Sequence, residues 1–377
     1  MTGKPYRVGI VGLTPQRSWA ARAHVPALLG LQDDFELSAV ANSNYESSRA
    51  AATALGIPWA FANAAELASS PLVDIVVVTV RVPYHFELVS TALNAGKHVF
   101  CEWPLGNGLA EAEELASLAK AKDLLGVVGT QARVAPQVEY LRQLISNGFI
   151  GSVQASSLIG TGGGWGSEIG STATGAYLLD RTNGATLLSI PLGHSLAAIR
   201  DVLGDISSLS AVVETRQTEI LAKDTGAMIP MTSPDQVLMS ATLESGAPFS
   251  VHYRGGNAHG VGLTWDIYGT FGDIRVTAPS GHMQMADLTL SSARGNNSEF
   301  QHLQIPQMYT HGWPTDSVVG NVARIYKRMA ADLRLGTATA PNFADAVELH
   351  RLLVSVERSA TSGQRISPNA PNRILPA

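Results

Sequence analysis

The stretch at residues 95–105, which reads AGKHVFCEWPL, decides the fold. A Gly-Lys turn leads into the short apolar run VFC at 99–101, and this run ends at Glu102, Trp103 and Pro104. Because proline has no N–H to donate to a strand ladder, the strand predicted here opens into a loop. In open parallel sheets, ligands bind at such carboxyl ends of strands. The stretch therefore predicts the edge of a ligand site.

Length and composition indicate a globular protein of two domains. The chain has 377 residues, whereas a single core stops growing at ~250 to 300 residues. Hydrophobic residues make up 45% and charged residues 15%, which excludes disorder throughout the chain. The net charge is −5 and the sequence has no run of Lys and Arg, so we do not expect it to bind nucleic acid.

Cysteine usage and hydropathy predict that the protein is located in the cytoplasm. Cys101 is the only cysteine, so no intrachain disulfide can form. The N-terminus leads into a short strand pattern, Val8 to Val11, and not into the apolar region of a signal peptide. No apolar run approaches the ~20 residues of a membrane span, so no membrane partner is expected. We interpret Cys101 as a small core thiol and not as a nucleophile.

The first half opens with a strand, a turn and a helix, which is the pattern of a nucleotide-binding unit. The strand ends at Leu13, the helix begins at Trp19, and the turn between them reads GLTPQRS at 12–18. Only Gly12 matches the glycines of a dinucleotide fingerprint, so a plain strand-to-helix turn is the alternative. In a glycine-rich fingerprint, backbone N–H groups of this turn contact the pyrophosphate. Thr14, Arg17 and Ser18 can supply side-chain donors in place of those contacts.

The second strand, Glu36 to Ala41, is followed by Asn42. At this position a carboxylate would hold a ribose 2′-hydroxyl, and without it nothing repels a 2′-phosphate. Ser43 and Arg49 supply donors close by, so the pattern slightly favours NADP over NAD. Alternatively, these residues form only a turn and a solvated helix face.

Helical and strand patterns alternate from Tyr45 to Thr130. This alternation predicts an α/β fold with a doubly wound parallel sheet. The first domain is expected to close near residue 130.

The segment at 95–104 resembles the AGKHV-x-x-EKP signature of the glucose-fructose oxidoreductase and inositol dehydrogenase (Gfo/Idh/MocA) family. The resemblance continues at QAR (131–133), LISNGFIG (144–151) and Gly193-His194, and it covers nearly the whole chain. It implies an N-terminal Rossmann domain that binds NAD or NADP, and a C-terminal α/β domain with a large, mostly antiparallel open sheet. That sheet forms the substrate pocket and often an oligomer interface. Family substrates are sugars, cyclitols and their derivatives.

Within the family, the sequence resembles the fungal galactose-regulon repressor, notably at the Glu102-Trp103 pair and in the loop GGGW at 162–165. That repressor binds a dinucleotide and a protein partner without known turnover, and it too has tryptophan in place of the family lysine. The resemblance therefore implies a regulatory protein as the alternative to an enzyme.

Two polar groups of the catalytic relatives are replaced in this chain. Trp103 stands where the family has a lysine that handles a proton as hydride moves, and an indole cannot exchange a proton near neutral pH. Ile190 stands where the family has an Asp, four residues before the pocket histidine. His194 remains, and the resemblance implies that it handles the proton. The other interpretation of His194 is a satisfied core histidine.

The second half contains a glycine-rich loop with a tryptophan, from Gly160 to Gly175. We expect this loop to line or close a pocket through Trp165, with a mobile surface loop as the alternative. Tyr177 is a second candidate acid or base, and Asp180 follows it.

Strand patterns recur from Ser208 to Leu290 and predict a mostly antiparallel sheet with one free face, which favours a homo-oligomer. No histidines have the spacing of metal ligands, so no metal is assigned. The helices Val319 to Arg334 and Phe343 to Ala360 are expected to pack against the first domain. The predicted domains are a dinucleotide-binding Rossmann domain at 1–130, a substrate-binding and oligomerisation domain at 131–366, and a tail at 367–377.

These observations lead to two hypotheses. The favoured one is an NAD(P)-dependent oxidoreductase that transfers a hydride between nicotinamide and a sugar-like or polyhydroxylated ring, with His194 or Tyr177 in the role left by the lysine. The other is a non-catalytic, dinucleotide-sensing regulator that binds a protein partner. The expected cofactor-binding residues are Gly12, Leu13, Thr14, Arg17, Ser18, Trp19, Asn42, Ser43, Arg49, Glu102, Trp103 and Arg133. The expected substrate residues are Trp103, Trp165, Asp180 and His194.

Overall fold

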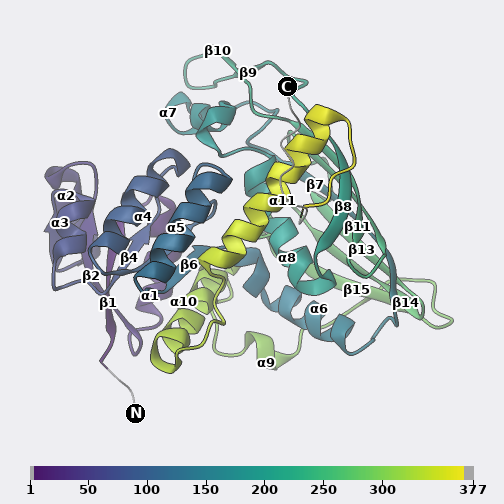
Figure 1. Ribbon diagram of the computed structural model, residues 1–377, viewed down its shortest axis with the longest axis horizontal. Coiled ribbons are helices and arrows are strands. Elements are labelled where there is room, and N and C mark those ends of the chain that lie inside the picture. Colours follow the sequence, from purple (N-terminus) through teal and green to yellow (C-terminus); the bar gives the residue numbers. More distant parts are fainter. Residues whose placement is uncertain (1–3, 369–377) are drawn as a thin grey trace. The chain divides into compact units, whose positions relative to one another are not determined.

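A computed structural model describes residues 4–368 (Figure 1). These residues form two compact units. The first runs to Ala135 and also takes in Thr310–Glu348, and the second takes in Pro136–Tyr309 and begins again at Leu349. Thr310–Glu348 therefore lies in the first unit, whereas the sequence prediction kept it in the second domain. Most of the predicted tail, from residue 369 onward, lies outside the described residues.

The first unit is built on a parallel sheet in the order β3-β2-β1-β4-β5-β6. The order reverses between β1 and β4, which makes the carboxyl ends of these two strands the switch point. This confirms the predicted doubly wound sheet. The strands are β1 (Tyr6–Val11), β2 (Phe35–Ala41), β3 (Trp59–Phe61), β4 (Ile75–Val78), β5 (His98–Glu102) and β6 (Gly126–Gly129). The helices between them are α1 (Val25–Leu29), which follows a π-helical turn at Ala20–His24, α2 (Tyr45–Leu55), α3 (Ala64–Ser69), α4 (His85–Asn94) and α5 (Leu109–Ala121).

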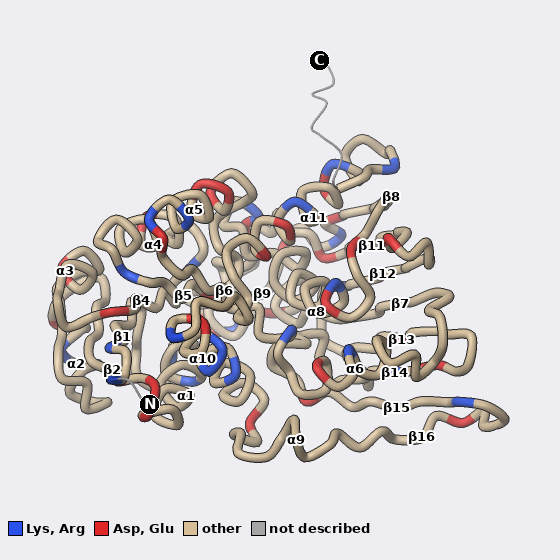
Figure 2. The backbone as a smooth tube through the Cα atoms, turned by 60° about the horizontal axis from the view of Figure 1, so that its bottom comes forward, with Lys and Arg blue, Asp and Glu red and all other residues tan. Residues whose placement is uncertain are grey.

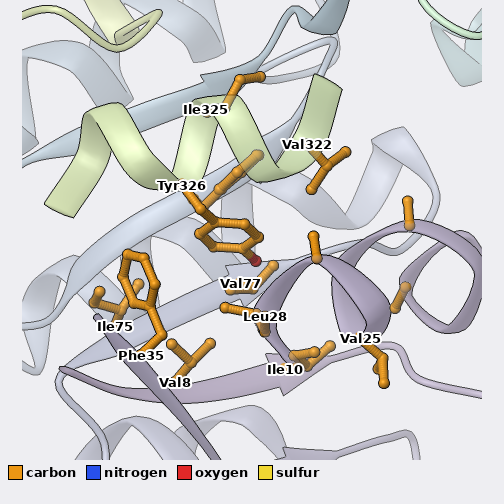
Figure 3. Packing of buried hydrophobic residues seen from close by; sticks show 14 of the residues in the cluster. Val8, Ile10, Val25, Leu28, Phe35, Ile75, Val77, Val322, Ile325 and Tyr326 are labelled. Atoms are coloured by element: carbon orange, nitrogen blue, oxygen red, sulfur yellow. The ribbon is translucent and has the colours of Figure 1, made fainter. Parts of the chain in front are cut away.

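Helix α10 (Ser317–Leu335) belongs to the first unit because its apolar face completes the core of that unit. Figure 3 shows Tyr326 of α10 above Phe35 and Val8 of the sheet, and all three are buried in one hydrophobic cluster. Asp316 caps the helix by accepting from the N–H groups of Val318 and Val319. The order of elements along the chain does not predict that α10 rejoins the first unit, because the apolar periodicity of a helix does not indicate which sheet the helix covers.

The second unit contains an eight-stranded sheet in the order β16-β15-β14-β13-β7-β12-β11-β8. Its pairs are antiparallel except for β12 with β7, which confirms the predicted, mostly antiparallel sheet. The strands are β7 (Val153–Gly162), β8 (Ile206–Glu214), β11 (Gln236–Leu243), β12 (Pro248–Gly255), β13 (Leu263–Gly269), β14 (Gly272–Ala278), β15 (Thr289–Arg294) and β16 (Gln301–His302). A separate hairpin is formed by β9 (Glu219–Leu221) and β10 (Met228–Pro230).

One face of this large sheet is packed and the other is exposed. In β11, Val237 and Met239 are buried, whereas Leu238 between them is 41% exposed. The register places Leu238 opposite Val212 of β8, and Ile159 of β7 lies on the same face at 56% exposure. The remaining helices are α6 (Pro136–Ser146), α7 (Thr172–Gly175), α8 (Gly193–Leu203), α9 (Gln307–Thr310) and α11 (Phe343–Ser362), and the boundary between the two units falls within α11.

No helix within residues 4–368 combines the length and the apolar character that crossing a membrane requires. In the same part of the chain, no three His, Cys, Asp or Glu side chains lie together as metal ligands would.

Candidate functional site

A cleft of about 640 Å³ lies in the first unit at the carboxyl ends of β1, β2 and β4. Four residues predicted from the turn and the second strand line it, namely Gly12, Thr14, Asn42 and Ser43. The other lining residues are Val11, Ser47, Asn63, Ala64, Val80, Arg81, Tyr84, Glu87 and Leu88. The cleft therefore lies at the switch point, where doubly wound sheets bind ligands.

Gly12 shapes the floor of this cleft, and its position admits no other residue without strain. Its φ of +95° lies in a region that L side chains rarely adopt, and a Cβ placed there would lie 2.6 Å from Cγ1 of Val80. Both Gly12 and Val80 line the cleft. The glycine therefore lets the turn after β1 approach the turn after β4.

Ser18 closes the turn that Gly12 opens. Its Oγ accepts from the N–H groups of Thr14 and Ala21 and donates to the carbonyl of Thr14. Ser18 thus acts as a local cap, and its hydroxyl is committed to the backbone. Arg17, by contrast, is exposed and is not among the residues that line the cleft.

Trp19 begins the segment after the turn, and its ring is partly buried against the core of the first unit. Among the residues that the structure describes, its indole Nε1 has no hydrogen-bond partner although it is buried. A buried N–H without a partner costs about 1 to 3 kcal/mol. Trp19 therefore offers one hydrogen-bond donor that no described residue uses.

Asn42 holds the turn from the other side. Its Oδ1 accepts from the Leu13 N–H at 2.8 Å, and its Nδ2 donates to the Leu13 carbonyl at 2.9 Å. The amide thereby fixes the turn after β1, which sequence reasoning did not foresee for this residue. Arg49, on α2, is exposed and does not line the cleft, whereas Ser43 does.

Sequence reasoning missed the lining residues that follow β3 and β4. Asn63 caps α3 by accepting from the Glu66 N–H, and Arg81 and Tyr84 come just after β4. The available signal was positional, because every loop at the carboxyl edge next to the switch point is a candidate for ligand contact.

Glu102, at the end of β5, lies in a hydrogen-bond network. His24 Nε2 donates to its Oε1 at 2.8 Å, and Gln131 Nε2 lies 2.9 Å from Oε1 and 2.7 Å from Oε2. Nδ1 of the same His24 ring lies 2.8 Å from the hydroxyl of Tyr326. Gly129 makes room for the carboxylate, since a Cβ there would lie 2.7 Å from both of its oxygens.

Trp103 is buried, at 4% exposure, and a cis peptide bond joins it to Pro104. The carbonyl of Pro104 lies 2.7 Å from Nδ1 of His85, whose Nε2 lies 3.0 Å from the carbonyl of Val80. The loop after β5 is thereby joined to a residue that lines the cleft. Burial of the His85 ring lowers its pKa.

Arg133, the last cofactor candidate, follows β6 in a 3₁₀ turn. Its guanidinium forms an ion pair with Asp345, with Nη1 and Oδ2 2.8 Å apart. This pair lies within the first unit, because Asp345 belongs to the returning segment.

In the second unit, His194 lies near the start of α8 and is 4% exposed. Its Nδ1 is buried and has no partner among the described residues. Burial lowers the pKa of His194 to about 3, and the neighbouring His282 adds to the shift. The imidazole is therefore neutral at physiological pH.

Trp165 packs beside these histidines. It is 2% exposed, its Nε1 donates to the Ala185 carbonyl, and its ring stacks on His282 with centroids 6.1 Å apart. Burial lowers the pKa of His282 to about 4. His282 is a polar residue that sequence reasoning missed, since it lies far from His194 along the chain.

Tyr253 fixes the spacing of these elements. Its hydroxyl donates to the Gly281 carbonyl at 2.7 Å and also bonds the Ser195 Oγ at 2.7 Å. Ser195 follows His194 and Gly281 precedes His282, so this chain of hydrogen bonds links the backbones that carry the two imidazoles.

The other two second-unit candidates lie on short turns. Tyr177 is partly buried on a 3₁₀ turn, and its carbonyl accepts from Nδ2 of Asn183. Asp180 is exposed, and its Oδ1 accepts from both the N–H and the hydroxyl of Thr182, which lowers its pKa. Asp180 thus acts as a local cap.

An open parallel sheet with a cleft at its switch point is typical of dinucleotide-binding proteins of the Rossmann class. Residues 6–130 match the oxidoreductase family with an NAD-binding Rossmann fold, and residues 136–278 match the C-terminal domain of Gal80p. The chain is thus similar to the Gfo/Idh/MocA oxidoreductase family in its first part and to the C-terminal domain of Gal80p in its second, which confirms the resemblance predicted from the signature.

Two relatives are similar along nearly their whole length. The galactose/lactose metabolism regulatory protein GAL80 of Saccharomyces cerevisiae is 27% identical, over 96% of this chain and 94% of the relative. The dehydrogenase aclE of Aspergillus oryzae is 29% identical, over 96% of this chain and 98% of the relative. The chain is thus similar both to a regulatory protein and to a dehydrogenase.

Solved structures share the fold. A super-repressor mutant of Gal80p from Saccharomyces cerevisiae has a TM-score of 0.87 and 27% identity, with 96% of this chain and 97% of that chain covered. Levoglucosan dehydrogenase in complex with NADH and L-sorbose has a TM-score of 0.81 and 21% identity, with 97% and 99% covered. The family and the fold support a nicotinamide dinucleotide as the cofactor.

Proposed function

We propose that this chain is an NAD(P)-dependent oxidoreductase that transfers a hydride between nicotinamide and a sugar-like or polyhydroxylated ring. The observation that carries the proposal is the cleft at the switch point, where Gly12 brings two turns together and leaves a space of about 640 Å³ lined by both polar and apolar residues. Similarity to a dehydrogenase over 96% of this chain supports catalysis.

The residues at the cleft suit a dinucleotide. Thr14, Ser43 and Ser47 offer hydroxyls and Arg81 offers a cation, while Asn42 holds the turn at Leu13. When bound, the nicotinamide supplies the hydride chemistry. The chain must bind and orient this group and handle the proton of the substrate hydroxyl.

His194 is the proposed proton-handling residue. Burial lowers its pKa to about 3 and keeps the ring neutral, and Nδ1 has no partner among the described residues, so the ring can accept a hydrogen bond from the substrate hydroxyl. Tyr177 is the second proposed acid or base. Trp103 and Trp165 are proposed to shape the substrate pocket with their apolar rings, and Asp180 is the remaining proposed substrate residue.

Turnover tests the enzyme proposal directly. The protein is incubated with NAD or NADP and a panel of sugars, cyclitols and glycosides while nicotinamide absorbance is recorded. We expect turnover with at least one compound and a loss of about 100-fold or more in His194→Gln. The matched control is His252→Gln on β12, which leaves turnover unchanged. Absence of turnover throughout the panel contradicts the proposal.

The second candidate is a dinucleotide-sensing regulator that binds a protein partner. Trp103 in the place of the family lysine and the similarity to GAL80 favour it. A pull-down in the presence and in the absence of NADH tests this candidate. We expect a transcription regulator to be retained in only one of these two conditions. Recovery of this chain alone counts against it.

NADP is slightly favoured over NAD, because no carboxylate follows β2 and hydroxyls of Ser43 and Ser47 line that part of the cleft. Calorimetry with both dinucleotides tests this preference, and equal or reversed affinity removes it.

We also propose a cytoplasmic homo-oligomer that forms through the exposed face of the large sheet. The register aligns Val212, Leu238, His252 and Ile159 across neighbouring strands, and the three aliphatic residues are 41–56% exposed. The four strands β7, β8, β11 and β12 carry almost no charge (Figure 2). An apolar, uncharged surface of this kind favours association.

A further inference from the structure

Two buried oxygens that follow β6 have no hydrogen-bond partner within residues 4–368. Thr130 and Gln131 are each 1% exposed, and within residues 4–368 neither the Thr130 hydroxyl nor the Gln131 amide oxygen meets a hydrogen-bonding group. A buried polar group without a partner costs about 1 to 3 kcal/mol. Two such groups on consecutive residues are therefore unusual in a folded protein.

The orientation of the Gln131 amide is fixed by Glu102. A carboxylate only accepts hydrogen bonds, so the nitrogen of Gln131 must face it, at 2.7 and 2.9 Å from its two oxygens. The amide oxygen is left as the unpaired end. His24 fixes Glu102 in turn, by donating from Nε2 at 2.8 Å.

Tyr326 completes this network. Nδ1 of the His24 ring lies 2.8 Å from the Tyr326 hydroxyl, so both ring nitrogens are hydrogen-bonded. Tyr326, His24 and Gln131 are all nearly or fully buried. The network therefore holds one acceptor, the Gln131 amide oxygen, in place on the residue that follows Thr130.

An acceptor next to a hydroxyl matches a primary carboxamide. The carboxamide NH₂ donates to an amide oxygen, and its C=O accepts from a hydroxyl. The cleft lined by Asn42, Ser43 and Asn63 lies over the ends of β1 to β4, so the other half of an extended dinucleotide reaches the ends of β5 and β6. Glu102, Thr130 and Gln131 are located there.

We propose that Thr130 and Gln131 bind the carboxamide of the nicotinamide and thereby set which face of the ring is presented. This inference rests on the proposed dinucleotide binding. The Tyr326–His24–Glu102 network acts as a positioning device for Gln131. Thr130 is the cleaner position to change, because its hydroxyl has no partner within the described chain.

The test compares NADH with ADP-ribose, which lacks the nicotinamide. The variant Thr130→Val removes the hydroxyl and leaves the Glu102 network intact. We expect NADH binding, measured by calorimetry, to weaken about three- to tenfold while ADP-ribose binding stays unchanged. If the protein prefers the phosphorylated dinucleotide, NADPH and 2′-phospho-ADP-ribose replace these probes.

Ser43→Ala is the matched control, because Ser43 lines the cleft over the other half of the sheet. The Ser43→Ala variant should weaken the binding of NADH and the binding of ADP-ribose by the same factor. A second variant, Gln131→Met, should lower NADH affinity selectively as well. Thermal unfolding without ligand verifies folding, and Thr130→Val should unfold at the same temperature as the wild type or above it.

The outcomes separate this inference from the proposed function. If NADH and ADP-ribose both bind and Thr130→Val and Gln131→Met weaken them equally or not at all, the carboxamide site is wrong and dinucleotide binding stands. If no dinucleotide binds to the wild type, both proposals fail.

Discussion

Replacing Gly12 by alanine should damage the first unit and its cleft together. Gly12 adopts a φ of +95°, and a Cβ at this position would lie 2.6 Å from Cγ1 of Val80. Val80 itself lines the cleft, so any shift that relieves the overlap changes the shape of the cleft. The substitution therefore acts on stability and on ligand binding through one contact.

The magnitude has two parts. An L residue in a sparsely populated backbone region costs about 1 to 3 kcal/mol. The overlap adds about 1 to 3 kcal/mol, because carbon atoms prefer a separation of about 3.5 to 4.0 Å and the turn must move to restore it. Together these terms predict a loss of about 2 to 6 kcal/mol, which lowers Tm by about 5 to 20 °C in a unit of this size.

Thermal unfolding and calorimetry with NADH provide the assay. We expect Gly12→Ala to lower Tm and to weaken the binding of NADH at least about tenfold. The matched control is Gly96→Ala, because Gly96 has a φ of +75° and its Cβ would meet nothing within 4 Å. The control should lose about 1 kcal/mol of stability and keep its NADH affinity. If Gly12→Ala binds NADH as tightly as the control does, the close approach of the two turns does not shape the cofactor site.

Three further predictions concern the pH dependence, the cofactor preference and the oligomer. Folding lowers the pKa of His194 to about 3, so below about pH 6.5 the His194 imidazole is protonated in the unfolded chain but not in the folded one, and unfolding is favoured as the pH falls. The wild type should therefore lose about 2 kcal/mol more stability than His194→Gln between pH 7 and pH 5 in urea unfolding, and equal losses would refute the burial argument. Arg81 lines the cleft and Arg49 does not, so calorimetry should show weaker NADPH binding in Arg81→Ala but not in Arg49→Ala; the reverse order would place the 2′-phosphate at α2. Ile159→Asp puts a charge on the exposed sheet face, so light scattering should show a smaller particle than for the wild type, and an unchanged mass would exclude that face as the interface.

Much of the fold was predictable because its signals are local. The strand predicted at Glu36 to Ala41 and the helix predicted at Phe343 to Ala360 differ by only one or two residues from β2 (Phe35–Ala41) and α11 (Phe343–Ser362). The hairpin of β9 and β10 was missed, since its short strands carry no apolar periodicity and are held by long-range bonds, such as that from the Ile169 N–H to the Leu221 carbonyl. The predicted strand patterns end at Leu290, whereas β15 runs from Thr289 to Arg294.

The candidate site was predictable only in part, because hydrogen-bond partners depend on contacts between distant residues. The sequence indicated that Gly12 and Asn42 lie at the sheet edge, yet it did not show that the amide of Asn42 would be bonded to Leu13. Likewise, nothing near Glu102 in the sequence points to His24 or Tyr326, which come from opposite ends of the first unit. A sequence pattern assigns a residue to an element, whereas its partner is set by the packing of that element.

The family combines dinucleotide binding with proton transfer by a lysine, and Trp103 replaces that lysine. Its neighbour Glu102 remains bonded to His24 and Gln131, so the support at the ends of β5 and β6 does not depend on the replaced lysine. Binding of a dinucleotide can therefore persist where proton transfer by that lysine is lost. His194 supplies the only imidazole that the family resemblance offers in its place, and its burial keeps it neutral. Affinity for NADH consequently reports on the Rossmann unit alone, and only turnover distinguishes an enzyme from a regulator built on the same fold.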